Sequence, residues 1–335
     1  MNVIFAIYEK EYNDVVWHAL NLATSLFNDG HDARIALCAD SPIAKEVKEA
    51  KLPIETILSA KSGFLAYLHQ KETFRALASR FRVDLMVSYG QTPSGATALK
   101  KASFANAVCG IGEKIAWVKS AKKIIASSKA VKTDLITRYK VKSDRVFIIY
   151  GGLDALSEDE RAKSRAEIRA KLELNDQNIL IGIFGDVTET SGHKLLIEAL
   201  TSDYNKNLKL IALVGDDSQI VPFKNLCRQY NISRVALVET LQKGDLALIS
   251  ALDIGVVASF EPSATARRAI ELIAAGVSVV ATSASADSEL ANAQNCFSEP
   301  YPNALLNAII AHEANDKTAD CASLRAAWNA LIRLR

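Results

Sequence analysis

Short apolar runs alternate with longer amphipathic segments along the first half of the chain. In segment 15–28, Val16, Leu20, Ala23 and Phe27 recur at helical spacing, and Gly30 follows where a helix C-cap is expected. The predicted strands lie at residues 3–8, 33–37, 85–88, 122–127 and 146–149, and a further helix lies at 130–139. Such alternation is typical of a parallel sheet with crossover helices.

The same alternation starts again in the second half, after Gly151-Gly152 and the charged stretch 157–171, which predict a linker and a surface helix. The run at 179–184 is continuously apolar, as expected for a strand buried on both faces. Further strands are predicted at 208–214, 235–238, 254–258 and 277–281, and helices at 193–200, 243–251, 265–275 and 322–334. A chain of 335 residues exceeds one compact core. We therefore expect domains at 1–152 and 153–320, followed by a C-terminal helix at 321–335.

The charge is divided unevenly between these halves. Residues 1–150 hold 22 Lys and Arg against 14 Asp and Glu, whereas the remainder holds 18 against 24. This asymmetry fits either a face that meets an anionic partner or an unevenly charged solvated surface.

The cysteines favour a reducing, cytoplasmic environment. The sequence has five cysteines, and none has another close to it in the chain: Cys38, Cys109, Cys227, Cys296 and Cys321. This spacing argues against a disulfide framework and against a zinc site. The apolar run at 3–8 is too short for a signal peptide, and no apolar stretch reaches 18 residues.

Several segments resemble one family of enzymes. AKKIIASSKAVKTDLITRYKVKSDRVFIIYGGLD at 121–154 is similar to the end of the N-terminal domain in family 4 glycosyltransferases (glycosyl transferases group 1). ILIGIFG, ending at Gly185, and SGHKLLIEAL resemble that family's first C-domain strand, loop and helix. Residues 253–289 resemble its donor-site segment without a gap, with Glu261-Pro262 and Arg267 in matching places.

The resemblance implies an α/β protein of the GT-B fold, in which two Rossmann-like doubly wound domains face a cleft. It implies an acceptor-side N-terminal domain, a donor-binding C-terminal domain and a C-terminal helix that returns towards the first. It also implies a retaining transferase, without a metal or cofactor, that uses a nucleotide sugar of unknown base to build lipopolysaccharide-type or other envelope glycans. Glu271 would then hold the donor ribose, since a carboxylate accepts bonds from two vicinal hydroxyls. Glu289 would support the donor, or would simply begin a helix.

Five sets of positions depart from the family pattern. Ser263 stands where a catalytic Glu orients the donor sugar, and Glu261 lies two residues earlier. The other departures are Asp186 and Ser191 in place of a diphosphate-binding Arg and Lys, Asn13-Asp14 and Ser285-Ala286 in place of glycine pairs, and Cys109 in the segment where a His is expected.

Other cations can compensate for the two missing ones. Lys194, Arg267 and Arg268 lie near the donor loops, and a helix after Gly192 would present free backbone amides to a phosphate. His18 and His193 both fall near helix starts, and we favour structural roles for them over catalytic ones.

The basic charge of the first half is concentrated between Lys100 and Lys142. This segment holds eleven Lys or Arg against Glu113 and Asp134. It suits contact with an anionic membrane surface, which would make the protein peripheral on the inner membrane face, or it is a solvated helix face. Sparse aromatic residues and the lack of a binding motif argue against nucleic acid.

Three functions stay open from the sequence. The first is glycosyl transfer, and the second is a transferase-like scaffold that has lost catalysis, which the altered positions suggest. The third, an epimerase or phosphorylase on the same scaffold, is weaker because no acid/base set of those enzymes is found.

Overall fold

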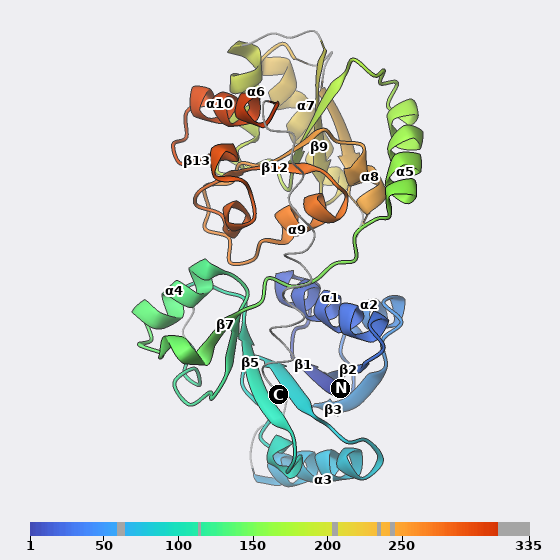
Figure 1. The fold of residues 1–335 in the computed structure, drawn as a ribbon, viewed down its shortest axis with the longest axis vertical. Helices are drawn as coiled ribbons and strands as arrows, with labels where there is room; N and C mark the ends of the chain where they lie inside the picture. The colour runs from blue at the N-terminus through green and yellow to red at the C-terminus, as the bar shows by residue number, and fades with distance from the viewer. Residues whose placement is uncertain (59–63, 113–114, 203–206, 233–235, 242–244, 314–335) are drawn as a thin grey trace. The chain divides into compact units, whose positions relative to one another are not determined.

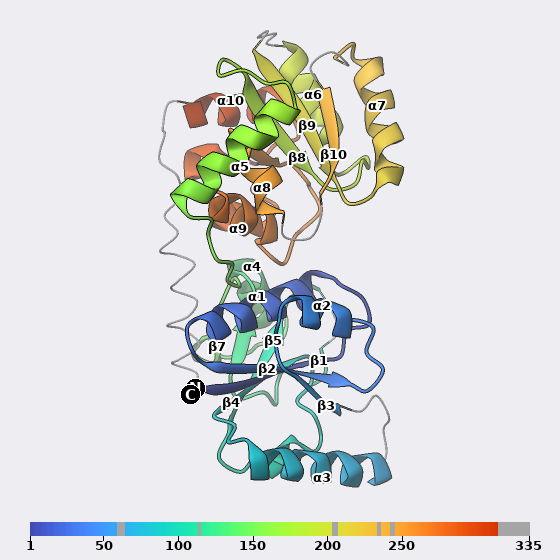
Figure 2. The same cartoon turned by 90° about the vertical axis from the view of Figure 1, so that its right-hand side faces the viewer.

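The chain folds into two α/β units, each built on its own parallel sheet (Figures 1 and 2). The computed structural model describes residues 1–58, 64–112, 115–202, 207–232, 236–241 and 245–313. The first unit runs from Met1 to Leu153, and the second begins at Asp154. The helix predicted at 322–334, and with it segment 321–335, lies outside the described residues.

The first unit contains a seven-stranded parallel sheet in the order β3-β2-β1-β4-β5-β6-β7. Its strands are β1 (Asn2–Ile7), β2 (Asp32–Cys38), β3 (Ile54–Leu58), β4 (Leu85–Tyr89), β5 (Ser103–Val108), β6 (Ile124–Ala126) and β7 (Val146–Ile148). Its helices are α1 (Asp14–Asn28), α2 (Ala44–Glu49), α3 (Phe64–Arg80) and α4 (Lys129–Thr137).

Alternate residues of the strands build two separate cores on the two faces of this sheet. Val3 and Phe5 pack beneath α1 and α2, whereas Ile4 packs with Phe74 and Leu77 of α3. Both faces are therefore covered, which explains why β1 is almost uniformly apolar.

The second unit contains a six-stranded parallel sheet in the order β10-β9-β8-β11-β12-β13. Its strands are β8 (Ile179–Phe184), β9 (Leu208–Val214), β10 (Ala236–Thr240), β11 (Ile254–Val257), β12 (Ser278–Thr282) and β13 (Cys296–Phe297). Its helices are α5 (Glu158–Lys171), α6 (His193–Ser202), α7 (Ile220–Gln229), α8 (Leu246–Ser250), α9 (Arg267–Ala274) and α10 (Pro302–Glu313).

The absence of a side chain at Gly255 lets α9 lie directly on the middle of this sheet. A Cβ placed on Gly255, in β11, would lie 2.1 Å from a methyl carbon of Leu272 in α9. Because the helix packs this close, its first residues are held at the end of β11. The position of α9 matters because the charged side chains of the candidate site lie at its start.

The charged stretch 157–171 forms α5, which begins with a capping box between Ser157 and Glu160. The helix is more than a surface element, because Arg165 and Arg169 both bind the carboxylate of Asp253 at the start of β11. The Arg169 side chain, 11% exposed, lies 3.0 Å from that carboxylate. The helix is thereby fixed to the amino end of the second sheet.

Candidate functional site

Several of the donor-side residues singled out from the sequence lie in loops at the carboxyl edge of the second sheet. Gly185 follows β8, residues 258–266 follow β11, and residues 283–286 follow β12. These three strands are neighbours, so their carboxyl ends meet at one edge. The strand order reverses between β8 and β11, and crevices at such switch points are where doubly wound sheets bind ligands.

The loop after β8 is closed by hydroxyl groups and glycines. The backbone at Gly185 and Gly192 is left-handed, with φ of 91° and 81°. Ser191 Oγ donates to the Thr188 carbonyl at 2.9 Å, accepts from the Thr188 amide at 3.0 Å and lies 2.8 Å from His193 Nδ1. Ser191 therefore shapes the loop that leads into α6.

Gly192 brings this loop against the residue that follows β11. A Cβ at Gly192 would lie 2.4 Å from the Cβ and 2.5 Å from the carbonyl oxygen of Ala258. This close approach, together with the positive φ, requires glycine at the position. The start of α6 and the end of β11 are thus packed backbone to backbone.

Glu261 joins the same two loops through its carboxylate. Thr190 Oγ1 donates to Glu261 Oε1 at 2.6 Å, and the amide of Phe260 donates to the carbonyl of Thr190 at 3.2 Å. Glu261 is exposed. Thr190 was not singled out in the sequence, because no motif marks a threonine that reaches an acid 71 positions away.

Ser263 and Ser285 connect the loops that follow β11 and β12. The two residues form an isolated parallel β-bridge, and the amide of Ala286 donates to the carbonyl of Ser263 at 3.3 Å. The hydroxyl of Ser263 donates to the carbonyl of Thr265 at 2.7 Å. Ser263 is therefore engaged in holding its own loop.

Asp287 fixes the first turn of α9 from the loop after β12. Its Oδ1 accepts from the amide of Ala269 at 2.7 Å, and its Oδ2 accepts from the Ser285 hydroxyl at 2.5 Å. Asp287 is 3% exposed. An acid at this end of a helix satisfies an amide that lacks an intrahelical partner and is favoured by the helix dipole.

Glu271 is buried between two arginines of its own helix. Its carboxylate accepts from Arg267 Nε at 2.9 Å and from Arg268 Nη1 at 2.6 Å. The Glu271 side chain is 2% exposed, whereas those of Arg267 and Arg268 are 17% and 27% exposed. The arginines consequently cover the carboxylate, and each keeps part of its side chain exposed. Arg268 also lies over the ring of Phe184, at the end of β8, with 5.4 Å between its guanidinium carbon and the ring centroid.

Three other donor-side candidates have different placements. Asp186 is exposed, and its Oδ1 lies 3.6 Å from the position a Cβ would take on Gly215, after β9. Lys194 is 63% exposed and pairs along α6 with Glu198 at 3.8 Å. Glu289 does not begin a helix, as the sequence interpretation suggested. It is the last residue of a single 3-10 turn, Ala286–Glu289, because the chain after β12 is occupied in bridging to Ser263.

His193 is buried at the start of α6, which supports a structural role. It is 1% exposed, and its ring meets Phe223 edge to face with 6.1 Å between centroids. Burial lowers the pKa of His193 to about 4, so the ring is neutral at physiological pH.

The acceptor-side candidates lie in the first unit. Asn13 caps α1, since its Oδ1 accepts from the Val16 amide at 3.1 Å, and Asp14 is the first residue of that helix. Asn13 thus has a structural role, since its side chain satisfies a backbone amide of the first turn. Cys109 follows β5 and packs against the core beneath α1.

His18 is buried within the first unit between two oxygen atoms. Its ring nitrogens lie 2.6 Å from the hydroxyl of Tyr89 and 2.7 Å from the carbonyl oxygen of Ile149. Burial lowers the pKa of His18 and raises that of Tyr89. His18 thus ties α1 to the ends of β4 and β7.

In the described part of the chain, no group of three or more His, Cys, Asp and Glu side chains is placed to hold a metal ion. No helix within those same residues is both long enough and apolar enough to cross a bilayer.

Comparison with known proteins gives one family model and many structures. Residues 164–327 match the model "Glycosyl transferases group 1". No curated protein matches the sequence.

The solved structures that resemble the chain cover nearly all of it. A glycosyltransferase from Rickettsia africae is 18% identical, with a TM-score of 0.74, and the match covers 99% of this chain and 93% of that one. Anabaena HepE in complex with UDP and glucose is 20% identical, with a TM-score of 0.68, and the match covers 100% of this chain and 95% of that one. The lipopolysaccharide outer core galactosyltransferase WaaB is 12% identical, with a TM-score of 0.68, and 99% of each chain is covered. The fold class predicted from the sequence, two Rossmann-like domains of GT-B type, is confirmed.

Proposed function

We propose that the chain is a glycosyltransferase that takes a sugar from a nucleotide-sugar donor at the carboxyl edge of the second sheet. The observation that carries this proposal is the Arg267–Glu271–Arg268 cluster at the switch point between β8 and β11. The buried carboxylate orients two partly exposed arginine side chains at the place where such sheets bind nucleotides. Guanidinium groups match the geometry of phosphate oxygens and suit a diphosphate.

The arginines would stabilise the charge that develops on the leaving nucleoside diphosphate. When the bond between the sugar and the diphosphate breaks, negative charge accumulates on the phosphate oxygens. Fixed cations near those oxygens lower the barrier without a metal, because they are already oriented before the reaction. The first amides of α6, after Gly192, offer additional donors to a phosphate.

Glu271 would therefore serve mainly to position the arginines in this chain. At 2% exposure its carboxylate is covered by both guanidinium groups. A ribose hydroxyl can reach it only if an arginine moves. The exposed carboxylate of Glu261 is better placed to bind a sugar hydroxyl and assumes part of the role that Ser263 cannot fill.

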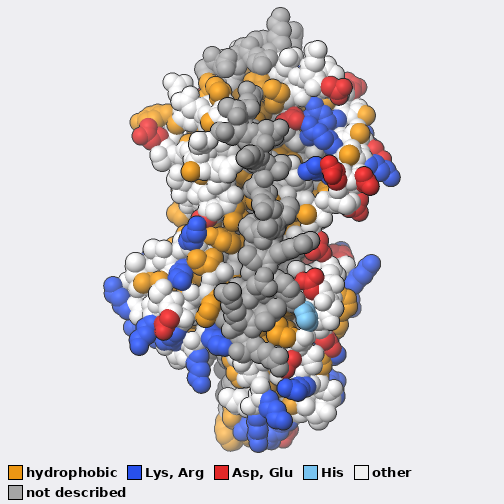
Figure 3. All heavy atoms as spheres, viewed as in Figure 1, with side chains coloured by type: hydrophobic (Ala, Val, Ile, Leu, Met, Phe, Trp, Pro, Cys, Tyr) orange, Lys and Arg blue, Asp and Glu red, His pale blue; other side chains and the backbone are white. Residues whose placement is uncertain are grey.

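We further propose a retaining reaction and an envelope or lipopolysaccharide-type glycan acceptor, carried on a lipid. WaaB and WaaG, whose folds this chain shares, act in lipopolysaccharide biosynthesis, and this supports the acceptor class. The segment from Lys100 to Lys142 would meet the anionic inner leaflet, each cation contributing about 1 kcal/mol near such a surface. Lys and Arg side chains are visible over α4, within this segment (Figure 3). Two cations have structural partners, since Lys132 donates to the Val146 carbonyl and Arg138 pairs with Asp134.

The second candidate is a transferase-like scaffold without catalysis. It is favoured by the side-chain contacts of Ser263 and Ser191, which hold loops where active relatives place an acid and a cation. The two candidates differ in sugar transfer, and nucleotide binding alone does not separate them.

Nucleotide binding is the first test. Calorimetry with UDP, GDP, ADP and CMP, starting with UDP because HepE is complexed with it, should identify one ligand. Arg268→Gln should lower the affinity for that ligand by about tenfold or more, since a charge-assisted contact contributes about 1.5–3 kcal/mol. Arg228→Gln, on the exposed surface of α7, is the matched control and should change nothing. Equal binding by both variants would refute the assigned diphosphate site.

Sugar transfer is the second test. The purified chain should release the nucleotide from its nucleotide sugar faster when a lipid-linked or lipopolysaccharide acceptor is added. Nucleotide binding without any acceptor-dependent release from a panel of such acceptors would favour the scaffold.

A further inference from the structure

A hollow of about 460 Å³ lies in the first unit, on the face of the sheet that α3 covers elsewhere. Its floor is β5, through Phe104 and Asn106, which lie on that face together with Met86. It extends back to Ser103 at the amino end of β5. Gln91 and Thr92 line it from the loop after β4, and Asn13, Asp14 and Cys109 are not among its lining residues.

The hollow exists because the connection from β5 to β6 does not place a helix here. Of the described residues between Val108 and Ile124, none is helical, and 116–120 form turns. Parallel strands are usually joined by a helix that covers the sheet. Here the irregular segment around Trp117 lines the hollow instead.

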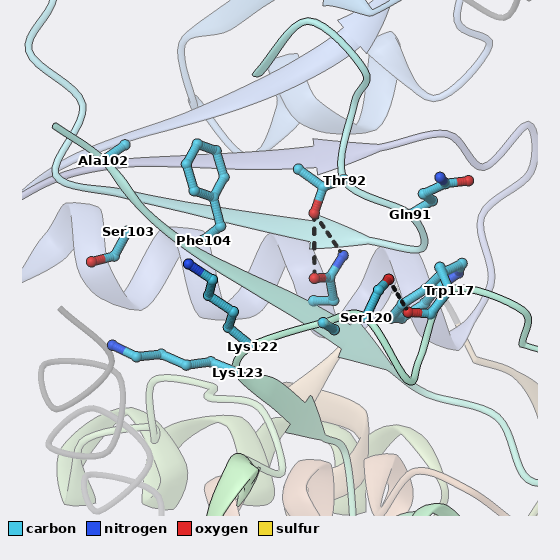
Figure 4. A pocket seen from close by; sticks show the side chains of 11 residues that line it. Gln91, Thr92, Ala102, Ser103, Phe104, Trp117, Ser120, Lys122 and Lys123 are labelled. Atoms are coloured by element: carbon cyan, nitrogen blue, oxygen red, sulfur yellow. Dashed lines mark hydrogen bonds between the residues drawn. The ribbon is translucent and has the colours of Figure 1, made fainter. Parts of the chain in front are cut away.

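The lining combines aromatic rings, hydroxyl and amide groups, and two cations. Trp117 and Gln91 lie at one end, Lys122 extends towards Ser103 at the other, and the Thr92 side chain lies between them (Figure 4). None of the eleven lining residues is acidic. The volume falls within the usual range of small-molecule sites.

The central polar group is held rigidly. Asn106 is 5% exposed, and its amide nitrogen donates to the Gly90 carbonyl at 2.8 Å and to Thr92 Oγ1 at 3.0 Å. A fixed amide that is already paired on its nitrogen keeps a defined orientation without loss of side-chain entropy on binding.

We propose that this hollow binds an anionic carbohydrate, namely a sugar that carries a phosphate or carboxylate group. The faces of Trp117 and Phe104 offer apolar surface to the carbon skeleton of a sugar ring. The hydroxyls of Thr92 and Ser103 suit sugar hydroxyls, which both donate and accept. Lys122 supplies charge for the anionic group. The inference goes beyond the proposed transfer reaction and does not depend on it, because no residue of the second unit takes part.

The test is calorimetric binding of glucose 6-phosphate, glucuronate, glucose, inorganic phosphate and UMP to the full chain. We expect one of the two anionic sugars to bind at least about three- to tenfold more tightly than glucose or phosphate, the gain from one added charged contact. Lys122→Ala and Trp117→Ala should each lower the affinity for that anionic sugar by a similar factor. Lys119→Ala, an exposed lysine in the same segment that does not line the hollow, should leave it unchanged.

Binding at the donor edge is distinguished by a further variant. Arg267→Gln should leave the affinity for the anionic sugar intact, while it lowers the affinity for the nucleotide of the proposed transfer reaction. Thermal unfolding confirms that each variant is folded. The proposal is overturned if no anionic sugar binds, if phosphate alone binds as tightly or UMP more tightly, or if folded Lys122→Ala and Trp117→Ala retain full affinity.

Discussion

Replacing Glu271 by glutamine tests whether this acid holds the two arginines in place. The carboxylate accepts charge-assisted hydrogen bonds from Arg267 and Arg268 at 2.9 and 2.6 Å while only 2% exposed. A glutamine has one carbonyl oxygen to accept from one arginine, and it would turn an NH2 group towards the other.

The magnitude follows from these contacts. Each charge-assisted bond contributes about 1.5–3 kcal/mol to the stability of the fold. An arginine left beside a buried NH2 group destabilises the fold further. Because the guanidinium groups keep some solvent, we expect a loss of about 2–4 kcal/mol in the free energy of unfolding. For a unit of this size, that loss lowers Tm by roughly 4–16 °C.

Glu198→Gln is the matched control. Glu198 pairs with the exposed Lys194 at 3.8 Å and accepts from the Tyr230 hydroxyl, a bond that glutamine can keep. It should lose less than about 1 kcal/mol. The assay is urea unfolding together with nucleotide calorimetry. Glu271→Gln should also weaken nucleotide binding by about tenfold. In the Arg268→Met background the same substitution should lower the free energy of unfolding by less, because Glu271 and Arg268 are coupled. A Tm and an affinity equal to wild type would refute the reasoning.

Two further predictions concern a loop and a titration. Gly192→Ala should lower the free energy of unfolding by about 3–5 kcal/mol, because a positive φ is combined with a collision against Ala258. Gly185→Ala has the same kind of φ but nothing within 4 Å of its Cβ, and it should lower the free energy of unfolding by only about 1–2 kcal/mol. Equal losses in urea unfolding would show that the collision is relieved. For His193, whose pKa burial lowers to about 4, the unfolded chain takes up a proton between about pH 6.5 and 4 that the folded chain does not. Its stability should therefore be full above pH 6.5 and fall by about 3 kcal/mol towards pH 4. His193→Gln should remove that part of the pH dependence and the exposed His69→Gln should not; identical pH profiles for both variants would contradict it.

Much of the architecture follows from the sequence, because it depends on local periodicity. Apolar runs at 3–8 and 179–184 predicted β1 and β8, and the repeat in 15–28 predicted α1 within one residue. The helix α3 was missed, since only Gln70, Phe74 and Leu77 are buried and its apolar stripe is weak. The strand β13 was missed because two residues carry no periodicity.

The sequence indicated which segments carry the candidate residues, but it did not indicate the contacts that these residues make. The resemblance drew attention to Glu271 and Arg267, and the structure places both at the carboxyl edge. It could not reveal that Asp287 fixes the first turn of α9, or that Thr190 binds Glu261 across 71 positions. Such bonds join residues far apart in the chain and leave no local pattern.

The sequence by itself determined the two alternating halves, the strands with both faces buried and the segment that would carry the donor site. Only the tertiary structure decided what the candidate donor-side residues contact. Ser263 and Ser191 satisfy backbone groups of their own loops, and Glu271 is covered by two arginines. The physical reason is that local spacing sets which face of an element is buried, whereas the partner of a buried polar group depends on which distant segments the packed core brings beside it.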